Sequence, residues 1–272
     1  MAARHTQFLT VDYQGAAIEI AVTRHHESDD LVLFLHGFGC TKESFDQAFD
    51  IPELEPFSIC SFDFPGHGQS DRAQSSSYSL QSYAEIANIL IDHIGPNRVF
   101  MVGHSMGGAV ALIATQGRQD IACLVSVDGN LVAQDCGIVS RFTAAQTEEE
   151  FISTGYAEFS GSLQNSSCSD EKAWAHWYAQ AEPLALYESA SSLVEWSDSG
   201  KLVEIFNVLD RKAYVYGDRE HKEYLLPLLV DAQICQIKGA GHFAMIDNPA
   251  GFYSTLSDIL LSARYRSCAA SR

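Results

Sequence analysis

The ten residues VFMVGHSMGG, at positions 99–108, decide the fold. Residues 99–102 are apolar and suit a buried strand, whereas residues 106–116 are rich in alanine and glycine and suit a packed helix. A Gly-x-Ser-x-Gly sequence joins the two, with Ser105 at its centre. Such a sharp turn lifts the serine hydroxyl out of the backbone, and Gly103 and Gly107 avoid clashes in the crowded turn. The stretch therefore predicts a strand, a turn that exposes a nucleophilic serine, and a helix.

The helix that follows Ser105 predicts that one side of this turn stabilises negative charge. Its positive end points at the hydroxyl, which favours charge that develops on a nearby oxygen. The sequence LFLHGFG, at positions 33–39, ends another predicted strand, and its glycines let the backbone approach the serine turn. We therefore expect the N–H groups of Phe38 and Met106 to form an oxyanion hole. One such donor stabilises the transition state by roughly 3–4 kcal/mol.

A histidine on a glycine-rich loop follows the last predicted strand. The loop reads GAGHF, at positions 239–243. A hydroxyl is a poor nucleophile at neutral pH and needs a base. A loop beyond the carboxyl end of a strand can bring His242 to Ser105, so the sequence predicts a nucleophile and its base.

Segments typical of strands and helices alternate on both sides of a central helical segment. The eight predicted strands are residues 8–13, 18–23, 31–35, 58–62, 99–102, 124–127, 213–216 and 233–237, and the predicted helices are residues 78–94, 106–116, 220–229 and 250–261. This alternation predicts an α/β fold, with a mostly parallel sheet and helices on both faces. Residues 131–207 carry helical patterns and no strand-like run. We interpret them as a helical cap, or lid, inserted into a core formed by residues 1–130 and 208–272.

These motifs make the sequence similar to the α/β-hydrolase superfamily, and to its carboxylesterase-like branch with a serine nucleophile. The resemblance rests on HGFG at 36–39, DFPGHGQS at 63–70, VGHSMGG at 102–108 and GH at 241–242, so it covers nearly the whole chain. It implies the α/β-hydrolase fold with an eight-stranded sheet and a helical lid after the sixth strand. It also implies that Ser105 is the nucleophile and His242 the general base.

A catalytic triad also needs a carboxylate that holds the histidine, and three candidates remain open. In superfamily members the acid usually follows the seventh strand, often three residues after a glycine, which favours Glu220 after Gly217. Asp218 lies closer to the end of that strand. Asp128 follows the sixth predicted strand, where some members have their acid. We take Glu220 as the first choice, with Asp218 and Asp128 as alternatives.

A serine nucleophile favours acyl transfer over the reactions of branches that use aspartate or cysteine. We predict a serine hydrolase that cleaves a small carboxylic ester or thioester through an acyl-enzyme intermediate. The same residues suit a hydrolase of carbon–carbon bonds in a β-diketone-like substrate, and a non-catalytic ligand-binding member of the fold is a further alternative. We expect His104, Trp174 and Trp177 to line the substrate pocket.

The amino-acid composition argues against several other classes of function. The chain has 17 Lys and Arg residues against 35 Asp and Glu residues, a formal net charge of −18, which disfavours binding to nucleic acids and to anionic membranes. The seven cysteines form no CxxC pair, so we expect neither a metal site nor a disulfide framework, and no cofactor. The start of the chain is unlike a signal peptide, and no apolar run is long enough to span a membrane. We therefore expect a cytoplasmic monomer or homodimer whose partner is a small-molecule ester.

Overall fold

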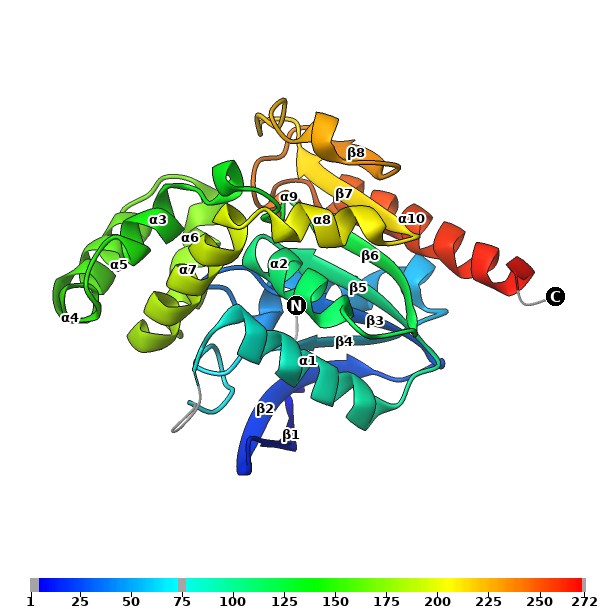
Figure 1. Cartoon of the computed structure of the whole chain (residues 1–272), viewed down its shortest axis with the longest axis horizontal. Helices are drawn as coiled ribbons and strands as arrows, with labels where there is room; N and C mark the ends of the chain where they lie inside the picture. The colour runs from blue at the N-terminus through cyan, green and yellow to red at the C-terminus, as the bar shows by residue number, and fades with distance from the viewer. Residues whose placement is uncertain (1–4, 73–76, 271–272) are drawn as a thin grey trace.

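An eight-stranded, mostly parallel sheet forms the centre of the protein (Figure 1). The structure is a computed structural model that describes residues 5–72 and 77–270. The strand order is β1-β2-β4-β3-β5-β6-β7-β8; β2 pairs antiparallel with β1 and β4, and the other neighbours are parallel. The strands are β1 (Gln7–Tyr13), β2 (Ala16–His25), β3 (Asp30–Leu35), β4 (Ser58–Phe62), β5 (Arg98–His104), β6 (Ile121–Val127), β7 (Lys212–Gly217) and β8 (Gln233–Ile237). The predicted fold class is confirmed.

The central strands are apolar on both faces because both faces of the sheet are covered. In β3, Leu33 and Leu35 belong to the core cluster on one face, whereas Val32 and Phe34 belong to the cluster on the other. A strand that is buried on both sides appears in the sequence as a continuous apolar run rather than an alternating one. This is why β3 and β5 are easily recognised from the sequence.

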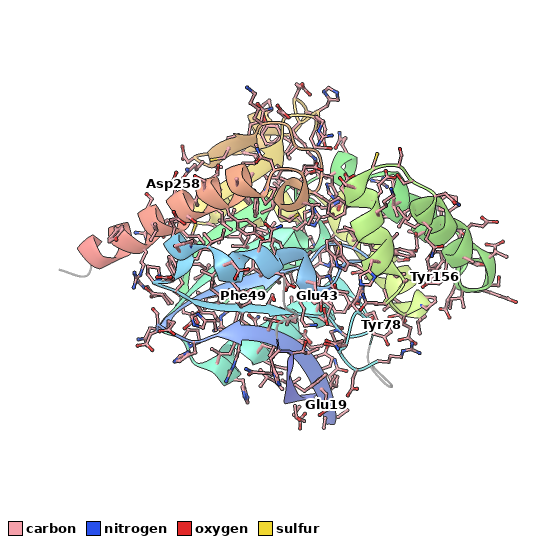
Figure 2. All side chains as sticks on the ribbon, turned by 180° about the vertical axis from the view of Figure 1, so that it is seen from behind. Glu19, Glu43, Phe49, Tyr78, Tyr156 and Asp258 are labelled. Carbon is pink, nitrogen blue, oxygen red and sulfur yellow. The ribbon has the colours of Figure 1, made fainter. Side chains whose placement is uncertain are left out.

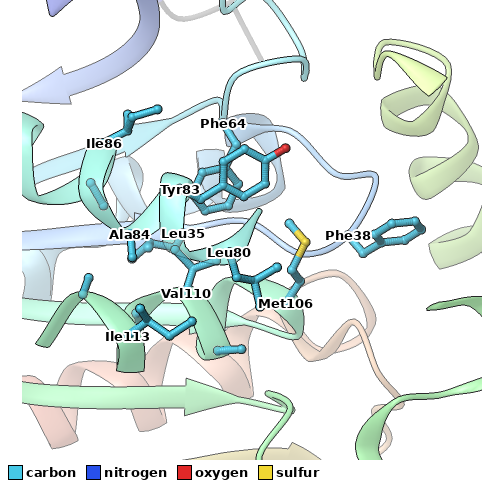
Figure 3. Close-up of a cluster of buried hydrophobic side chains, with 14 of the residues drawn as sticks. Leu35, Phe38, Phe64, Leu80, Tyr83, Ala84, Ile86, Met106, Val110 and Ile113 are labelled. Carbon is cyan, nitrogen blue, oxygen red and sulfur yellow. The ribbon is translucent and has the colours of Figure 1, made fainter. Parts of the chain in front are cut away.

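Helices cover the two faces of the sheet. On one face lie α1 (Leu80–Ile94) and α2 (Met106–Thr115), which enclose a cluster that includes Leu35, Tyr83 and Val110 (Figure 3). Figure 2 shows the molecule from behind, where α10 (Pro249–Ala270) and the 3₁₀ helix η1 (Lys42–Asp50) lie. The remaining short elements of the sheet domain are η2 (Pro52–Leu54), η5 (Leu226–Leu228) and α9 (Ala244–Asp247). No helix within the described ranges combines the length and the apolar character needed to cross a membrane.

The segment between β6 and β7 is helical, and most of it lies beside the sheet rather than over it (Figure 1). It contains η3 (Ala133–Asp135), α3 (Ile138–Ala144), α4 (Glu148–Glu150), the π-helical turn η4 (Phe151–Gly155), α5 (Tyr156–Gln164), α6 (Ser169–Tyr178), α7 (Pro183–Asp198) and α8 (Lys201–Val208). Helix α8 contacts α2 on the face of the sheet. We therefore propose that the cap consists of η3 to α7 and that α8 belongs to the core.

The predicted helix at residues 220–229 is wrong. This segment consists of turns and the short η5. Pro227 lies inside the predicted helix, and proline lacks the N–H that a helix interior requires. The chain after β7 instead folds back over the carboxyl end of the sheet, where its side chains line the cavity described below.

Candidate active site

Ser105 occupies a strained turn between β5 and α2. Its φ of 52° and ψ of −121° are unusual for a residue other than glycine. A side chain at Gly103 would clash with the carbonyl of Gly107, and one at Gly107 would clash with the carbonyl of Leu35. The N–H of Ser105 donates to the carbonyl of Val127 at 3.0 Å, which ties the turn to the end of β6. The structure thus shows the sharp turn that the sequence predicts.

The loop after β3 lies against this turn. A Cβ at Gly37 would be 3.3 Å from the Cβ of Ser105. The carbonyl of Gly37 accepts hydrogen bonds from the N–H of Cys40 at 3.1 Å and from Nδ1 of His36 at 2.9 Å. Because a trans peptide places its N–H opposite its carbonyl, the N–H of Phe38 points away from these two donors.

Met106 supplies the first N–H of α2, which has no acceptor within its own helix. In Figure 3, Phe38 stands apart from the other labelled side chains, and Met106 lies on the side of the group that is nearest to it. The indole N–H of Trp174, from α6, donates to the carbonyl of Phe38 at 2.9 Å. A residue of the cap thus fixes the next peptide of the loop after β3.

His242 lies on the loop after β8 and faces the end of β6. Its Nδ1 is 2.5 Å from Oδ2 of Asp128. The ring also packs beside the ring of His104, with 4.7 Å between the centroids, and Nε2 of His104 contacts the carbonyl of His242 at 3.0 Å. Asp218 accepts hydrogen bonds from the N–H groups of Gly239 and Ala240, so its carboxylate shapes the histidine loop.

Among the three carboxylates that the sequence leaves open, Asp128 is the one in contact with His242. The side chain of Asp128 is fully buried, and its φ of 44° marks a tight turn after β6. Asp218 is engaged by the loop backbone, as described above. Within the described residues, Glu220 lines the cavity without a hydrogen bond to His242. Glu220, the first choice of the sequence analysis, is therefore not the carboxylate at Nδ1 of His242. It lies on the tight turn after β7, where its N–H donates to the carbonyl of Gly217.

Asp128 is held at both carboxylate oxygens. Besides His242 on Oδ2, Nζ of Lys222 lies 2.6 Å from Oδ1, and the hydroxyl of Tyr214 donates to Oδ1 at 3.3 Å. Burial raises the pKa of Asp128, but the charges of His242 and Lys222 outweigh burial and lower it. The carboxylate is therefore ionised at neutral pH.

The two neighbouring histidines differ in their pKa. Burial lowers the pKa of His242, but the charge of Asp128 and the hydrogen bond to it leave it above its ordinary value. Burial lowers the pKa of His104 to about 3, so this ring stays neutral. His104 then donates from Nε2, and its buried Nδ1 has no hydrogen-bonding partner among the described residues.

Ser105, His242 and Asp128 line one cavity with a volume of about 410 Å³. Further wall residues come from the core, the cap and the loop after β7: Phe38, His104, Trp174, Glu220, Lys222 and Phe243. His104 and Trp174 thus lie where the sequence analysis expects them. Trp177 does not line this cavity: it is buried, with its ring 6.4 Å from that of Phe243, and it borders a separate pocket with Glu43 and Asp46. Lys222 was missed, since the sequence gives no signal for a lysine in a segment that resembles an exposed helix.

Most of the chain resembles a known protein family, and parts of it resemble individual proteins. The profile of the alpha/beta hydrolase family matches residues 32–255. A putative esterase/lipase of Mycoplasma pneumoniae is 36% identical over 103 residues, which are 38% of each chain. The 2-succinyl-6-hydroxy-2,4-cyclohexadiene-1-carboxylate synthase of Salmonella arizonae is 29% identical over 84% of this chain and 93% of its own.

Solved structures show the same fold. A thermophilic esterase from Thermogutta terrifontis superposes with a TM-score of 0.75 at 18% identity, over 95% of this chain and 99% of its own. A structure from a study of carboxylesterases of Nitrososphaera gargenis gives a TM-score of 0.79 at 15% identity, over 96% of this chain and 100% of its own. Together with the matched profile and the Ser105 turn between β5 and α2, these similarities show that the chain belongs to the alpha/beta hydrolase family.

Proposed function

We propose that the protein is a serine hydrolase that cleaves small carboxylic esters or thioesters through an acyl-enzyme intermediate. The observation that carries this proposal is the meeting of Ser105, His242 and Asp128 at one cavity, with Nδ1 of His242 2.5 Å from Asp128. A nucleophile, a base and a group that orients the base are the parts that acyl transfer needs.

In the proposed reaction, His242 takes the proton of the Ser105 hydroxyl as the oxygen attacks the carbonyl carbon of the ester. Asp128 holds Nδ1 protonated, so Nε2 is free to act as the base, and its charge stabilises the imidazolium that forms. His242 then protonates the leaving alcohol or thiol. Water, activated by the same histidine, attacks the acyl-enzyme and releases the acid, which restores Ser105.

The negative charge on the carbonyl oxygen is stabilised by the N–H groups of Phe38 and Met106. Three observations support this role. The carbonyl of Gly37 is turned toward Cys40 and His36, so the N–H of Phe38 faces elsewhere. The N–H of Met106 begins α2, whose positive end favours an anion. The loop that carries Phe38 packs against Ser105.

The cavity favours a small and partly polar ester. Its volume of about 410 Å³ lies near the lower end of the range for small-molecule sites. Phe38, Trp174 and Phe243 offer apolar surface to an acyl chain, whereas Glu220 and Lys222 add polar groups to the cavity wall. We therefore expect short acyl chains to be preferred over long ones.

Hydrolysis of p-nitrophenyl esters from acetate to octanoate tests the proposal. We expect turnover that is highest for the shorter esters and that falls by about 10⁴-fold or more in Ser105→Ala, because the nucleophile is lost. Ser140→Ala is the matched control, since Ser140 is another hydroxyl residue on the wall of the same cavity. Equal rates for Ser105→Ala and the unmodified protein would refute the proposal.

A further inference from the structure

Lys222 places a positive charge beside Asp128, the proposed acid, although the triad chemistry requires no cation there. It lies on the loop after β7 with 8% of its side chain exposed. Its Nζ is 2.6 Å from Oδ1 of Asp128 and 3.4 Å from Oδ1 of Asp135, on η3 at the start of the cap. His242 uses the other oxygen of Asp128, Oδ2. Two loops thus bind opposite oxygens of one buried carboxylate.

This arrangement restricts the carboxylate of Asp128. A carboxylate bound at one oxygen can rotate about its Cβ–Cγ bond, whereas contacts at both oxygens fix its plane. Among the described residues, the other hydrogen-bonding partner of Oδ1 is the hydroxyl of Tyr214, a longer and uncharged contact at 3.3 Å. We propose that Lys222 is a positioning residue of the active site, which orients Asp128 toward His242 and tempers the basicity of that histidine. This inference rests on the function proposed above.

The charges around His242 predict in which direction Lys222 shifts the basicity of this histidine. His242 faces Asp128 at the end of β6, Glu220 and Lys222 on the loop after β7, and the neutral His104 at the end of β5. The two carboxylates favour the imidazolium form, and the ammonium of Lys222 opposes it. The reaction needs a neutral His242 that can accept a proton. Loss of the ammonium therefore raises the pKa of His242 and moves the low-pH limit of activity to higher pH.

The surroundings of Lys222 explain why it stays charged although it is buried. Burial lowers its pKa, but the carboxylates of Asp128 and Asp135 raise it by more. The hydroxyl of Tyr224 donates to the same oxygen of Asp135 at 2.6 Å, so that carboxylate has partners besides Lys222. The ammonium is thus a fixed charge throughout the pH range in which His242 titrates.

Lys212 is a matched lysine for the test. It is also 8% exposed and lies at the start of β7, whereas the site lies beyond the end of this strand. Its ammonium donates to the carbonyls of Asn207 and Leu209 rather than to the triad carboxylate. Loss of Lys212 therefore removes an equally buried lysine without a change at Asp128.

The experiment measures the pKa of His242 in the full chain and in Lys222→Met, Lys222→Gln, Lys222→Arg and Lys212→Met. The pKa is read from the NMR titration of ¹³Cε1-labelled histidine, with the signal assigned from His242→Asn. The dependence of kcat/KM on pH for p-nitrophenyl butyrate is recorded in parallel. Lys222→Gln keeps a hydrogen-bonding group without the charge, so the test stands if Lys222→Met fails to fold.

We expect Lys222→Met and Lys222→Gln to raise two midpoints, that of the His242 NMR titration and that of the pH dependence of kcat/KM, by on the order of one pH unit. We also expect these variants to lower kcat by a larger factor than they change KM. Lys222→Arg and Lys212→Met leave the midpoints in place. Unchanged midpoints in both neutral variants would overturn the inference. If no variant hydrolyses the ester, the proposed function fails, but the NMR titration still reports whether Lys222 acts on His242.

Discussion

The turn after β5 holds Ser105 at a φ of 52°, and the turn after the neighbouring strand β6 holds Asp128 at a φ of 44°. Both residues lie at the carboxyl end of the sheet and line the same cavity. The two turns nevertheless depend on different parts of the chain. The Ser105 turn needs Gly103 and Gly107 within two residues on either side. At the Asp128 turn, the side chain is held by Lys222 and His242, which are about a hundred residues away in the sequence.

This difference teaches which functional residues a single sequence can reveal. Steric limits on a tight turn act between close neighbours, so they leave a motif at fixed spacing. A buried carboxylate is stabilised by the charges that surround it in space. Those charges come from segments of the chain that only the complete fold brings together. A nucleophile is therefore visible in the sequence before its acid is.

After loss of the proposed nucleophile itself, the largest expected effect comes from loss of the proposed acid. Asp128→Asn removes the charge that stabilises the imidazolium and disturbs the hydrogen bond at Nδ1 of His242. We expect kcat/KM for p-nitrophenyl butyrate to fall by about 10²–10⁴-fold. Glu220→Gln, the matched change in the same cavity, should cost less than about fivefold, since Glu220 makes no hydrogen bond to His242 within the described part of the chain. A larger loss in Glu220→Gln than in Asp128→Asn would restore the first choice made from the sequence.

A smaller effect, measured as a loss of stability, distinguishes the backbones of the two turns by how much room each leaves for a side chain. A methyl group at Gly107 meets the carbonyls of Leu35 and His36, which are backbone and cannot move aside. At Gly129, beside Asp128, it meets mainly the hydroxyl of Ser126, which can rotate. We expect Gly107→Ala to lower the free energy of unfolding by about 2–4 kcal/mol and Gly129→Ala by about 1 kcal/mol. Urea denaturation measures both, and equal losses would contradict the view that only the serine turn is locally constrained.

The sequence predicted the sheet, the serine turn and the histidine loop, because each leaves a local pattern: continuous apolar strands, or glycines around one polar residue. It failed for the segment after β7, where amphipathic spacing favours a helix and tertiary contacts of Lys222 with Asp128 accompany a turn instead. It also expected Trp177 at the cavity, although α6 directs Trp174 there. Which of two aromatic residues on one helix faces a site depends on how that helix is rotated, and local spacing does not determine this.

The smallest effect concerns the link between the cap and the serine turn. Trp174→Phe keeps an aromatic ring and removes the indole N–H that donates to the carbonyl of Phe38. Loss of one hydrogen bond beside the proposed oxyanion hole should lower kcat by about 2–10-fold, with little change in KM. Trp196→Phe, on α7 of the cap, is the control. If the two variants lose the same activity, the cap does not act through Phe38.

Covalent labelling tests the central claim most directly, namely that His242 and Asp128 activate Ser105. The protein is treated with a fluorophosphonate, and the modified residue is located by peptide mass spectrometry in the unmodified chain, Asp128→Asn and Glu220→Gln. The account predicts one adduct per chain on Ser105, formed at a similar rate in Glu220→Gln and at least about a hundred times more slowly in Asp128→Asn. No adduct on Ser105 of the folded, unmodified chain, or equal labelling rates in all three proteins, would contradict it.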